Sequence, residues 1–274
     1  MSNSVITNAS ALVALQNLNA TNSKLAATQS RVNTGLKVQG AKDNAATWAI
    51  AQNQRADMSA LESVKTSLNR ATSLADVALA AGQQISDILV ELRQKATAAA
   101  DPSASAATRK AYDDEFQALL TSLGSFAANA SFDGENILDG SSTTALDFLA
   151  NADASETISM NRQNLTLAGL SLTGLDLTTE TNATAGLTAI EAALTDANAK
   201  LAELGAQSKQ IEKHTQFVTK LMDSLEVGVG NLVDADMARE SARLQALQVQ
   251  QQLGAQALSI ANQGPQNILS LFKG

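Results

Sequence analysis

Few residues of this chain have the types and spacing that catalysis or metal binding needs. His214 is the single histidine and cysteine is absent, so thiolate metal sites are excluded and the histidine has no nucleophile context. Asp234, Asp236 and Glu240 could bind a cation, but the ligand spacing of an EF-hand loop is missing. We interpret these carboxylates as helix-start residues and His214 as a solvated or helix-flank residue. The sequence therefore predicts no catalytic residue, no metal site and no cofactor.

The composition favours long helices. Of 274 residues, 45% are hydrophobic but only 3% are aromatic, and Ala and Leu, which supply most of the apolar mass, are good helix formers. The net charge of -8 argues against nucleic acid or an anionic membrane as a partner. The sequence contains no apolar run of about eighteen residues, so no membrane-spanning helix is expected. The opening sequence MSNSVITNAS lacks the basic and apolar regions of an ordinary secretory signal, so none is expected.

A seven-residue repeat predicts a helix that pairs with another near the N-terminus. Steps of four and three residues are typical of the interface of a coiled coil. Two of the interface positions are polar, Asn22 and Gln29, and polar residues there fix the register at a cost in stability. The predicted interface consists of Ala11, Leu15, Leu18, Asn22, Leu25, Gln29, Val32 and Leu36.

The next part of the chain predicts a helical rod with a small insert. Gly35 and Gly40 bracket a basic, polar joint, and helices are expected near 45–100, 105–130 and 187–230. Between the second and third of these helices, Asp133-Gly134 and Asp139-Gly140 signal turns, and 146–150 and 157–160 have strand character. We therefore expect a β-containing surface insert at 131–184, with exposed Ser- and Thr-rich loops.

The repeat returns at the C-terminus and predicts the partner of the first helix. It includes Met237, Leu244, Leu247, Gln251, Gly254, Leu258 and Ala261. Gly264-Pro265 is expected to break the helix and to leave an apolar tail. The predicted fold is mainly α, a long antiparallel coiled-coil or helical bundle with paired N- and C-terminal helices and a small β-containing insert.

The paired ends are predicted to fold only when neighbouring molecules cover them. Ordering about 75 terminal residues costs roughly 1–2 kcal/mol each in backbone entropy. Offsetting about 100 kcal/mol at about 25 cal/mol per Å² needs on the order of 4,000 Å² of apolar burial. One thin helix pair with polar interface residues does not supply that area alone.

Five phrases in order along the chain resemble bacterial flagellins. The family's opening TN…AL…LN occurs within residues 7–19, its R-L-S-S-G-L-R-I joint as RVNTGLKV at 31–38, and its S-A-K-D-D-A-A as AKDNAA at 41–46. Its F-N-G-x-x-L-L-D-G phrase is similar to FDGENILDG at 132–140. Its C-terminal D-A-D…E…A-N-Q-x-P-Q-N-x-L-S-L-L phrase matches Asp234 to Asp236, Glu240 and ANQGPQNILSLF at 261–272.

The resemblance implies a structural subunit that polymerises into the hollow helical flagellar filament used for swimming. Residues 1–44 with 231–274 would form the inner core, 45–130 with 185–230 the helical rod, and 131–184 the surface insert. The implied partners are further copies of the chain, alone or mixed with other flagellins, the flagellar export chaperone and export apparatus, and the hook-filament junction and cap proteins. The implied location is the extracellular filament, reached by type III export without a cleaved signal peptide.

The implied site residues fall into three groups. The filament-core interface would consist of Leu15, Leu18, Asn22, Leu25, Val32, Leu36, Leu244, Leu247, Leu258, Ile268, Leu271 and Phe272. The joint would consist of Arg31, Gly35, Lys42 and Asp43. Because many flagellins carry sugars on their outer surface, the candidate O-glycosylation sites are Ser141, Ser142, Thr143, Thr144, Ser171, Thr173, Thr178, Thr179, Thr181 and Thr184.

Three other functions are weighed against the filament subunit. A flagellin-like hook-filament junction protein is the alternative, but such proteins share the terminal phrases more loosely. A cytoplasmic coiled-coil signalling protein of the chemoreceptor type is disfavoured by the insert at 131–184. An enzyme is not expected, since no His, Cys or carboxylate constellation supports one.

Overall fold

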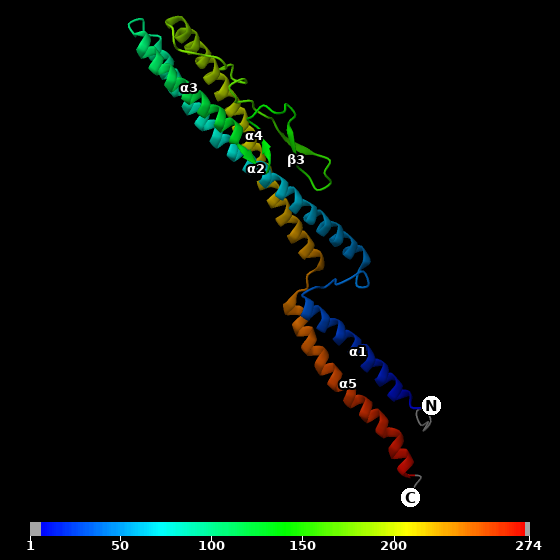
Figure 1. The fold of residues 1–274 in the computed structure, drawn as a ribbon. Helices are drawn as coiled ribbons and strands as arrows, with labels where there is room; N and C mark the ends of the chain where they lie inside the picture. The colour runs from blue at the N-terminus through cyan, green and yellow to red at the C-terminus, as the bar shows by residue number, and fades with distance from the viewer. Residues whose placement is uncertain (1–6, 272–274) are drawn as a thin grey trace. The chain divides into compact units, whose positions relative to one another are not determined.

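The computed structural model describes residues 7–271, with side chains described as far as Gln263 (Figure 1). This part of the chain is mainly helical, as predicted. It contains the helices α1 (Ala9–Thr34), α2 (Ala45–Ala99), α3 (Ala106–Asn129), α4 (Glu180–Val233) and α5 (Met237–Leu271), and the strands β1 (Ser131–Phe132), β2 (Glu135–Asn136), β3 (Leu146–Leu149) and β4 (Thr157–Met160).

The chain forms two compact units. We call Met1–Ala56 with Ser224–Gly274 the terminal unit, and Asp57–Asp223 the central unit. Helices α2 and α4 each contribute residues to both units. The terminal unit therefore takes one segment from each end of the chain, whereas the central unit is continuous in sequence.

In the terminal unit, α1 and α5 lie side by side and run antiparallel (Figure 1). The start of α1 meets the far part of α5, where Asn8 bonds to Ala261, and the end of α1 meets the start of α5, where Arg31 pairs with Glu240. Helix α1 ends at Gly35, whose φ of +72° is the left-handed conformation that glycine adopts at helix ends. The two terminal segments therefore pair as the repeats predict.

The central unit is a helical bundle of α2, α3 and α4 (Figure 1). Its apolar positions recur at three- and four-residue steps, so each helix buries one face. On α2 the packing is close at Gly82, where an added Cβ would lie 2.2 Å from Leu201 Cδ2. The buried residues of the three helices include Leu61, Leu68, Ile85, Leu89, Leu92, Phe116, Leu123, Ile190, Leu204, Ile211 and Val218.

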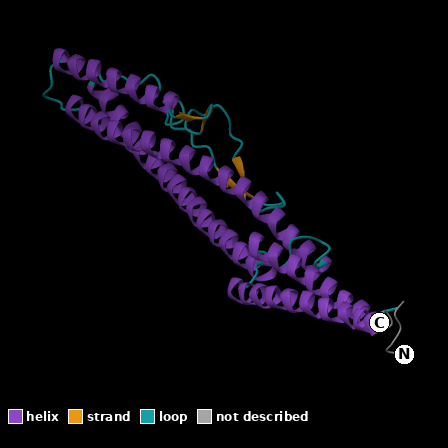
Figure 2. Ribbon diagram, turned by 90° about the horizontal axis from the view of Figure 1, so that it is seen from below, coloured by secondary structure: helices purple, strands orange, loops and turns teal. Residues whose placement is uncertain are grey.

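The insert between α3 and α4 has two short antiparallel hairpins, shown in orange in Figure 2. Asp133 and Gly134, with φ of 53° and 80°, connect β1 and β2, as the predicted turn requires. The predicted strands are present as β3 and β4, paired from Leu146 with Met160 to Leu149 with Thr157. The insert is less polar than expected, because its sequence also supplies the buried residues Ile137, Leu138, Phe148, Ile158, Met160, Leu165, Leu172 and Leu177.

Two element boundaries differ from the predicted ones. Helix α4 begins at Glu180, so residues 180–184 are helical and not loop; the Thr179 hydroxyl accepts the Asn182 backbone N–H at 3.1 Å and caps the helix. Helix α5 continues through Gly264-Pro265 to Leu271, where the sequence predicts a break. A proline removes one helical hydrogen bond and its ring crowds the carbonyl four residues earlier, so local propensity predicts a break at this position.

Candidate functional site

The acidic residues near 234–240 have structural partners. Asp236 caps α5 by accepting the Arg239 backbone N–H at 3.1 Å. Glu240 lies 3.5 Å from the Arg31 guanidinium across the two helices. Among the residues that the structure describes, no group of three or more His, Cys, Asp or Glu residues could hold a metal ion. These carboxylates therefore belong to the helix start and to a helix–helix contact.

Of the two interpretations of His214, solvated or helix-flank, the structure contradicts the first, since the residue lies on α4 but is not fully solvated. It is half-buried, and its Nε2 lies 2.7 Å from the backbone oxygen of Ala150, just after β3. Its ring centroid lies 5.8 Å from that of Phe217. The histidine thus connects α4 to the insert, and its role is positional.

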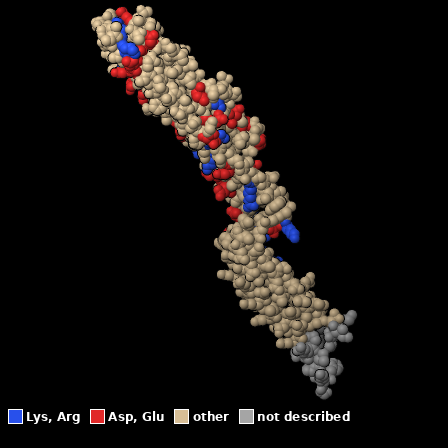
Figure 3. Space-filling view, viewed as in Figure 1, with Lys and Arg blue, Asp and Glu red and all other residues tan. Residues whose placement is uncertain are grey.

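The surface of the α1–α5 pair is unusual because it carries almost no charge. Helix α1 contains only Lys24 and Arg31, and α5 contains no charged residue after Arg243. Figure 3 shows the contrast: the face over these helices is nearly all tan, whereas the central unit carries many acidic and basic side chains. A solvent-facing helix normally carries many charges, so this surface is suited to burial.

Large apolar side chains also project from this pair. Leu12 and Val13 of α1 are 60% and 57% exposed, and Leu253 and Ile260 of α5 are 58% and 68% exposed. A groove of about 520 Å³ runs between the helices beside them, lined by Val13, Ala14, Leu18, Leu253, Gly254 and Ala257 among others. Val13 and Leu253 both line this groove, and large exposed apolar patches mark interaction sites.

The face of α1 that packs against α5 differs from the predicted one at every second position. Leu15, Asn22 and Gln29 are exposed, and a smaller residue just before each of them faces α5 instead. Small residues let the two helices approach closely, and they leave Leu15 at the surface. The least exposed residues along this face are Ala11, Ala14, Leu18, Thr21, Leu25, Thr28 and Val32.

On α5 the predicted positions agree better with the structure. Leu247 is buried, and Leu244, Gln251, Gly254 and Leu258 are half-buried. Gln251 donates a 2.8 Å hydrogen bond to Asn22 Oδ1, so Asn22 reaches the partner helix from the edge of the interface. An added Cβ at Gly254 would lie 3.2 Å from Leu18 Cδ1. The side chains of Ile268 and Leu271, and the whole of Phe272, lie outside the described residues.

The joint that follows α1 is an ordered connection. Leu36 forms an antiparallel bridge with Asp234, and the Lys37 and Val38 backbone N–H groups donate to the Val233 oxygen at 2.7 and 3.2 Å. The predicted joint residues have distinct roles, because Gly35 ends α1, Arg31 pairs with Glu240, Asp43 accepts the Gln39 backbone N–H at 2.9 Å, and Lys42 is exposed.

Glu240 is a strongly constrained charged group of the terminal unit. Its side chain is 10% exposed, compared with 30% for Arg31. Its Oε2 is buried and has no hydrogen-bond partner among the described residues. A buried carboxylate needs its paired charge, so Arg31 is the group that makes this arrangement possible.

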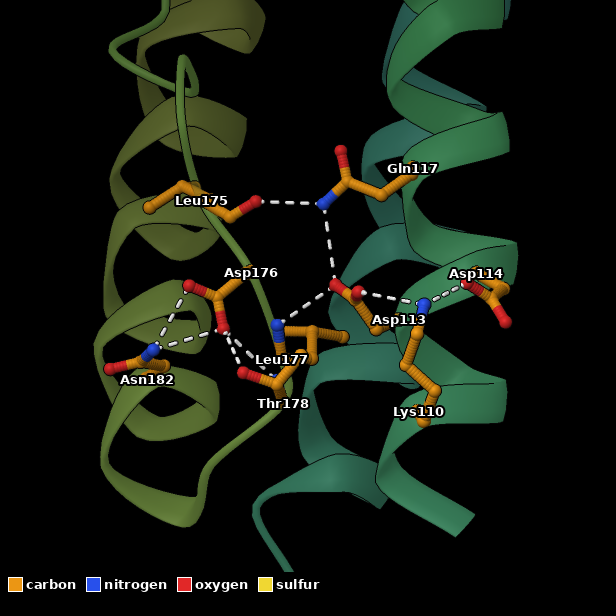
Figure 4. Close-up of polar contacts among 9 residues, drawn as sticks. All are labelled: Lys110, Asp113, Asp114, Gln117, Leu175, Asp176, Leu177, Thr178 and Asn182. Atoms are coloured by element: carbon orange, nitrogen blue, oxygen red, sulfur yellow. Dashed lines mark hydrogen bonds and ion pairs between the residues drawn. The ribbon is translucent and has the colours of Figure 1, made fainter. Parts of the chain in front are cut away.

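A second polar cluster fixes the insert to α3 in the central unit (Figure 4). The buried Asp113 carboxylate accepts the Leu177 backbone N–H at 3.0 Å, and Gln117 donates to the Leu175 oxygen at 2.8 Å. Beside them, a side-chain hydrogen bond from Asn182, followed by bonds from Thr178, lowers the pKa of Asp176 from its ordinary value. The cluster holds the last loop before α4 in place.

The candidate glycosylation residues lie on the insert or at the start of α4. Ser142 is half-buried and the other nine are exposed. Several hydroxyls are already used: Thr178 donates to Asp176, Thr179 caps α4, and Thr184 donates to the Glu180 oxygen. Thr181 and Thr184 lie within α4. Thr143 combines exposure with a loop position.

Sequence reasoning missed two features of this region. One is the small-residue face of α1, for which the Ala and Thr residues at three- and four-residue steps were the available signal. The other is the Asn8 side chain, which donates to the Ala261 oxygen at 2.7 Å. The sequence signal for this contact was Pro265, because a proline four residues after Ala261 has no backbone N–H to donate to the Ala261 oxygen.

The chain matches known protein families at both ends. Residues 5–143 match the bacterial flagellin N-terminal helical region, and residues 187–272 match the bacterial flagellin C-terminal helical region. Flagellin FljK of Caulobacter vibrioides is 51% identical over 272 residues, which cover 99% of each chain. Flagellin FljM of the same organism is 50% identical over 272 residues, again 99% of each chain. A flagellin of Brucella melitensis is 39% identical over 286 residues and 99% of each chain.

Two solved structures share the fold. The crystal structure of Bacillus cereus flagellin has a TM-score of 0.51 at 22% identity and covers 56% of this chain and 88% of its own. A structure described as a putative flagellar hook-associated protein from Vibrio parahaemolyticus has a TM-score of 0.58 at 12% identity, covering 70% of this chain and 100% of its own. At these identities the likeness concerns the fold alone.

Proposed function

The chain belongs to the bacterial flagellin family and is a structural subunit of the flagellar filament, not an enzyme, and we propose that its paired helices α1 and α5 form the filament's inner core. The observation that supports this most directly is the nearly uncharged α1–α5 surface with its exposed Leu12, Val13, Leu253 and Ile260. Burial of charged groups is costly, whereas apolar burial stabilises an assembly by about 25 cal/mol per Å².

The core interface has two layers in this proposal. Leu15 and the other exposed apolar residues meet neighbouring molecules, and Asn22 lies between the two layers. Ile268, Leu271 and Phe272 extend the same interface at the end of the chain. The residues that hold the pair together within one molecule are Leu18, Leu25, Val32, Leu244, Leu247 and Leu258, together with Leu36 at the joint.

We propose three domains for the subunit in the filament. Residues 1–44 with 231–274 form the core, 45–130 with 185–230 form the next shell, and 131–184 face water. Open repetition of one heterologous contact then gives a helical filament in place of a closed ring. In this proposal the α1–α5 pair of one molecule contacts the α1–α5 pair of the next, and the exposed apolar residues of both helices favour such contacts.

Flagellins form filament polymers, and the similarity to both FljK and FljM, two flagellins of one organism, suggests that polymers can be mixed. The finer partners of the proposal are the export chaperone, the export apparatus, and the hook-filament junction and cap proteins. Its location is the extracellular filament, reached by type III export without a cleaved signal. Among the described residues no helix is long and apolar enough to cross a membrane.

The insert carries the proposed O-glycosylation. Thr143 is the acceptor to test first; like Ser141 and Thr144, it is exposed and lies in the loop between β2 and β3. The intact mass of chains taken from native filaments tests this. A mass equal to that of the bare chain would exclude the modification, and a mass increase that persists in Thr143→Ala would assign it elsewhere.

Seeded polymerisation observed by electron microscopy tests the core assignment. The full chain is expected to extend filament fragments, and Leu253→Lys is expected to stop extension, because the lysine would place a charge in the buried core. Thr143→Lys is the matched control, since it adds the same charge to the insert. Failure of the unsubstituted chain to polymerise where another flagellin does would refute filament formation, and normal extension by Leu253→Lys would refute the core assignment alone.

A further inference from the structure

The Asn8 side chain makes two hydrogen bonds that belong to different helices. Its Oδ1 accepts the Ala11 backbone N–H at 3.1 Å and caps the start of α1. Its Nδ2 donates to the backbone oxygen of Ala261 in α5 at 2.7 Å. One partner is a donor and the other an acceptor, so both ends of the amide are used in the chemistry that suits them.

The acceptor on α5 is a carbonyl that lacks the donor it would have in a regular helix. In an α-helix the oxygen of residue 261 accepts the N–H of residue 265. Here residue 265 is proline, which has no backbone N–H. Helix α5 nevertheless continues to Leu271. The Asn8 amide supplies the donor that Pro265 lacks.

We propose that Asn8 and Pro265 act together as a register lock between the terminal helices, with Asn8 as the positioning residue. The capping geometry attaches Asn8 to the first turn of α1, and the proline creates one free carbonyl on α5. The pair therefore aligns at a single register, and α5 keeps its course past Pro265 only with α1 in place. This inference rests on the proposed function, because the lock matters when the terminal unit orders in the filament.

Residue type at position 8 is tightly restricted by this double role. Asp caps a helix as well as Asn but offers no donor to a carbonyl. Ser also caps well, but its shorter side chain does not carry an amide to the second helix. Asn8→Ser therefore removes the bond to Ala261 while it keeps the cap, which makes it the appropriate test variant.

A double-mutant cycle tests the lock. The critical concentration for seeded polymerisation is measured for the full-length chain, Asn8→Ser, Pro265→Ala and the double variant. Asn8→Ser alone is expected to raise the critical concentration about threefold to tenfold, as loss of one partly buried hydrogen bond predicts. In the Pro265→Ala background the rise is expected to be under about twofold, because the new backbone N–H satisfies Ala261.

Equal effects of Asn8→Ser in both backgrounds, or no effect in either, would overturn the lock. If Pro265→Ala forms no filaments, amide exchange in Asn8→Ser filaments decides instead: faster exchange confined to α5 around Ala261 supports the lock, and unchanged exchange overturns it. Polymerisation of the unsubstituted chain distinguishes failure of this inference from failure of the proposed function.

Discussion

Removal of the Arg31 charge is expected to weaken filaments strongly. Arg31→Met keeps most of the side-chain length but leaves Glu240, which is 10% exposed, without its partner at 3.5 Å. Breaking a buried pair on one side costs about 3–5 kcal/mol. Because Arg31 is itself 30% exposed, water reaches the site, and we expect about 2 kcal/mol for this pair. That corresponds to a roughly thirtyfold rise in critical concentration.

The decisive comparison is with a variant in which Glu240 is replaced together with Arg31. Arg31→Met with Glu240→Met replaces the pair by two apolar side chains, which for buried pairs is often close to neutral. We therefore expect the double variant to polymerise within about fivefold of the unsubstituted chain. Arg239→Met is the control, because Arg239 is 84% exposed and its closest carboxylate lies 3.9 Å away. A double variant that is as impaired as Arg31→Met would refute the reasoning.

Three further expectations concern packing, pH and order. Gly254→Leu is expected to raise the critical concentration at least about tenfold, since even a Cβ there lies 3.2 Å from Leu18; Gly205→Leu, with open space, is the control. The side-chain hydrogen bond from Asn182 is the largest cause of the lowered pKa of Asp176, so the ionised carboxylate is stabilised in the folded state. Stability of the central unit in urea should therefore decline as the pH falls below 3.8 and through the folded pKa, and Asp176→Asn should lessen that decline. Amides of α1 and α5 should exchange rapidly in monomers and slowly in filaments; protection in the monomer would contradict assembly-coupled folding.

The repeat predicts which helices pair better than it predicts which face of α1 is used. Leu15 and Ala14 are adjacent, and both fit a pattern of four- and three-residue steps. Sequence reasoning favours the larger residue because core positions are usually large and apolar. In the structure Ala14 faces α5 and Leu15 is 43% exposed. A helix with two interfaces has apolar residues on more than one side, and periodicity alone cannot assign them.

Other differences between the predicted and the observed structure arise where the stabilising contact comes from a distant part of the sequence. Gly264-Pro265 predicts a helix end from local propensity, but the donor that compensates Pro265 comes from Asn8, which lies 253 positions before Ala261. The contact of His214 with the Ala150 oxygen is not predicted from the sequence, because that oxygen lies in the insert, 64 positions away. The strands at 146–149 and 157–160 were predictable because their signals are local.

The two units differ in their distribution of charge, and this difference agrees with the proposed assembly. Ion pairs connect the elements of the central unit, as Arg93 with Glu191 and Arg162 with Glu135, and its buried apolar residues come from three helices and the insert. The terminal unit has one thin helix pair, whose helices contain few charged side chains to stabilise them alone. The same scarcity of charged side chains lowers the cost of burying that pair among neighbours. The expected weak order of the monomer and the proposed core of the filament therefore have one cause in the sequence.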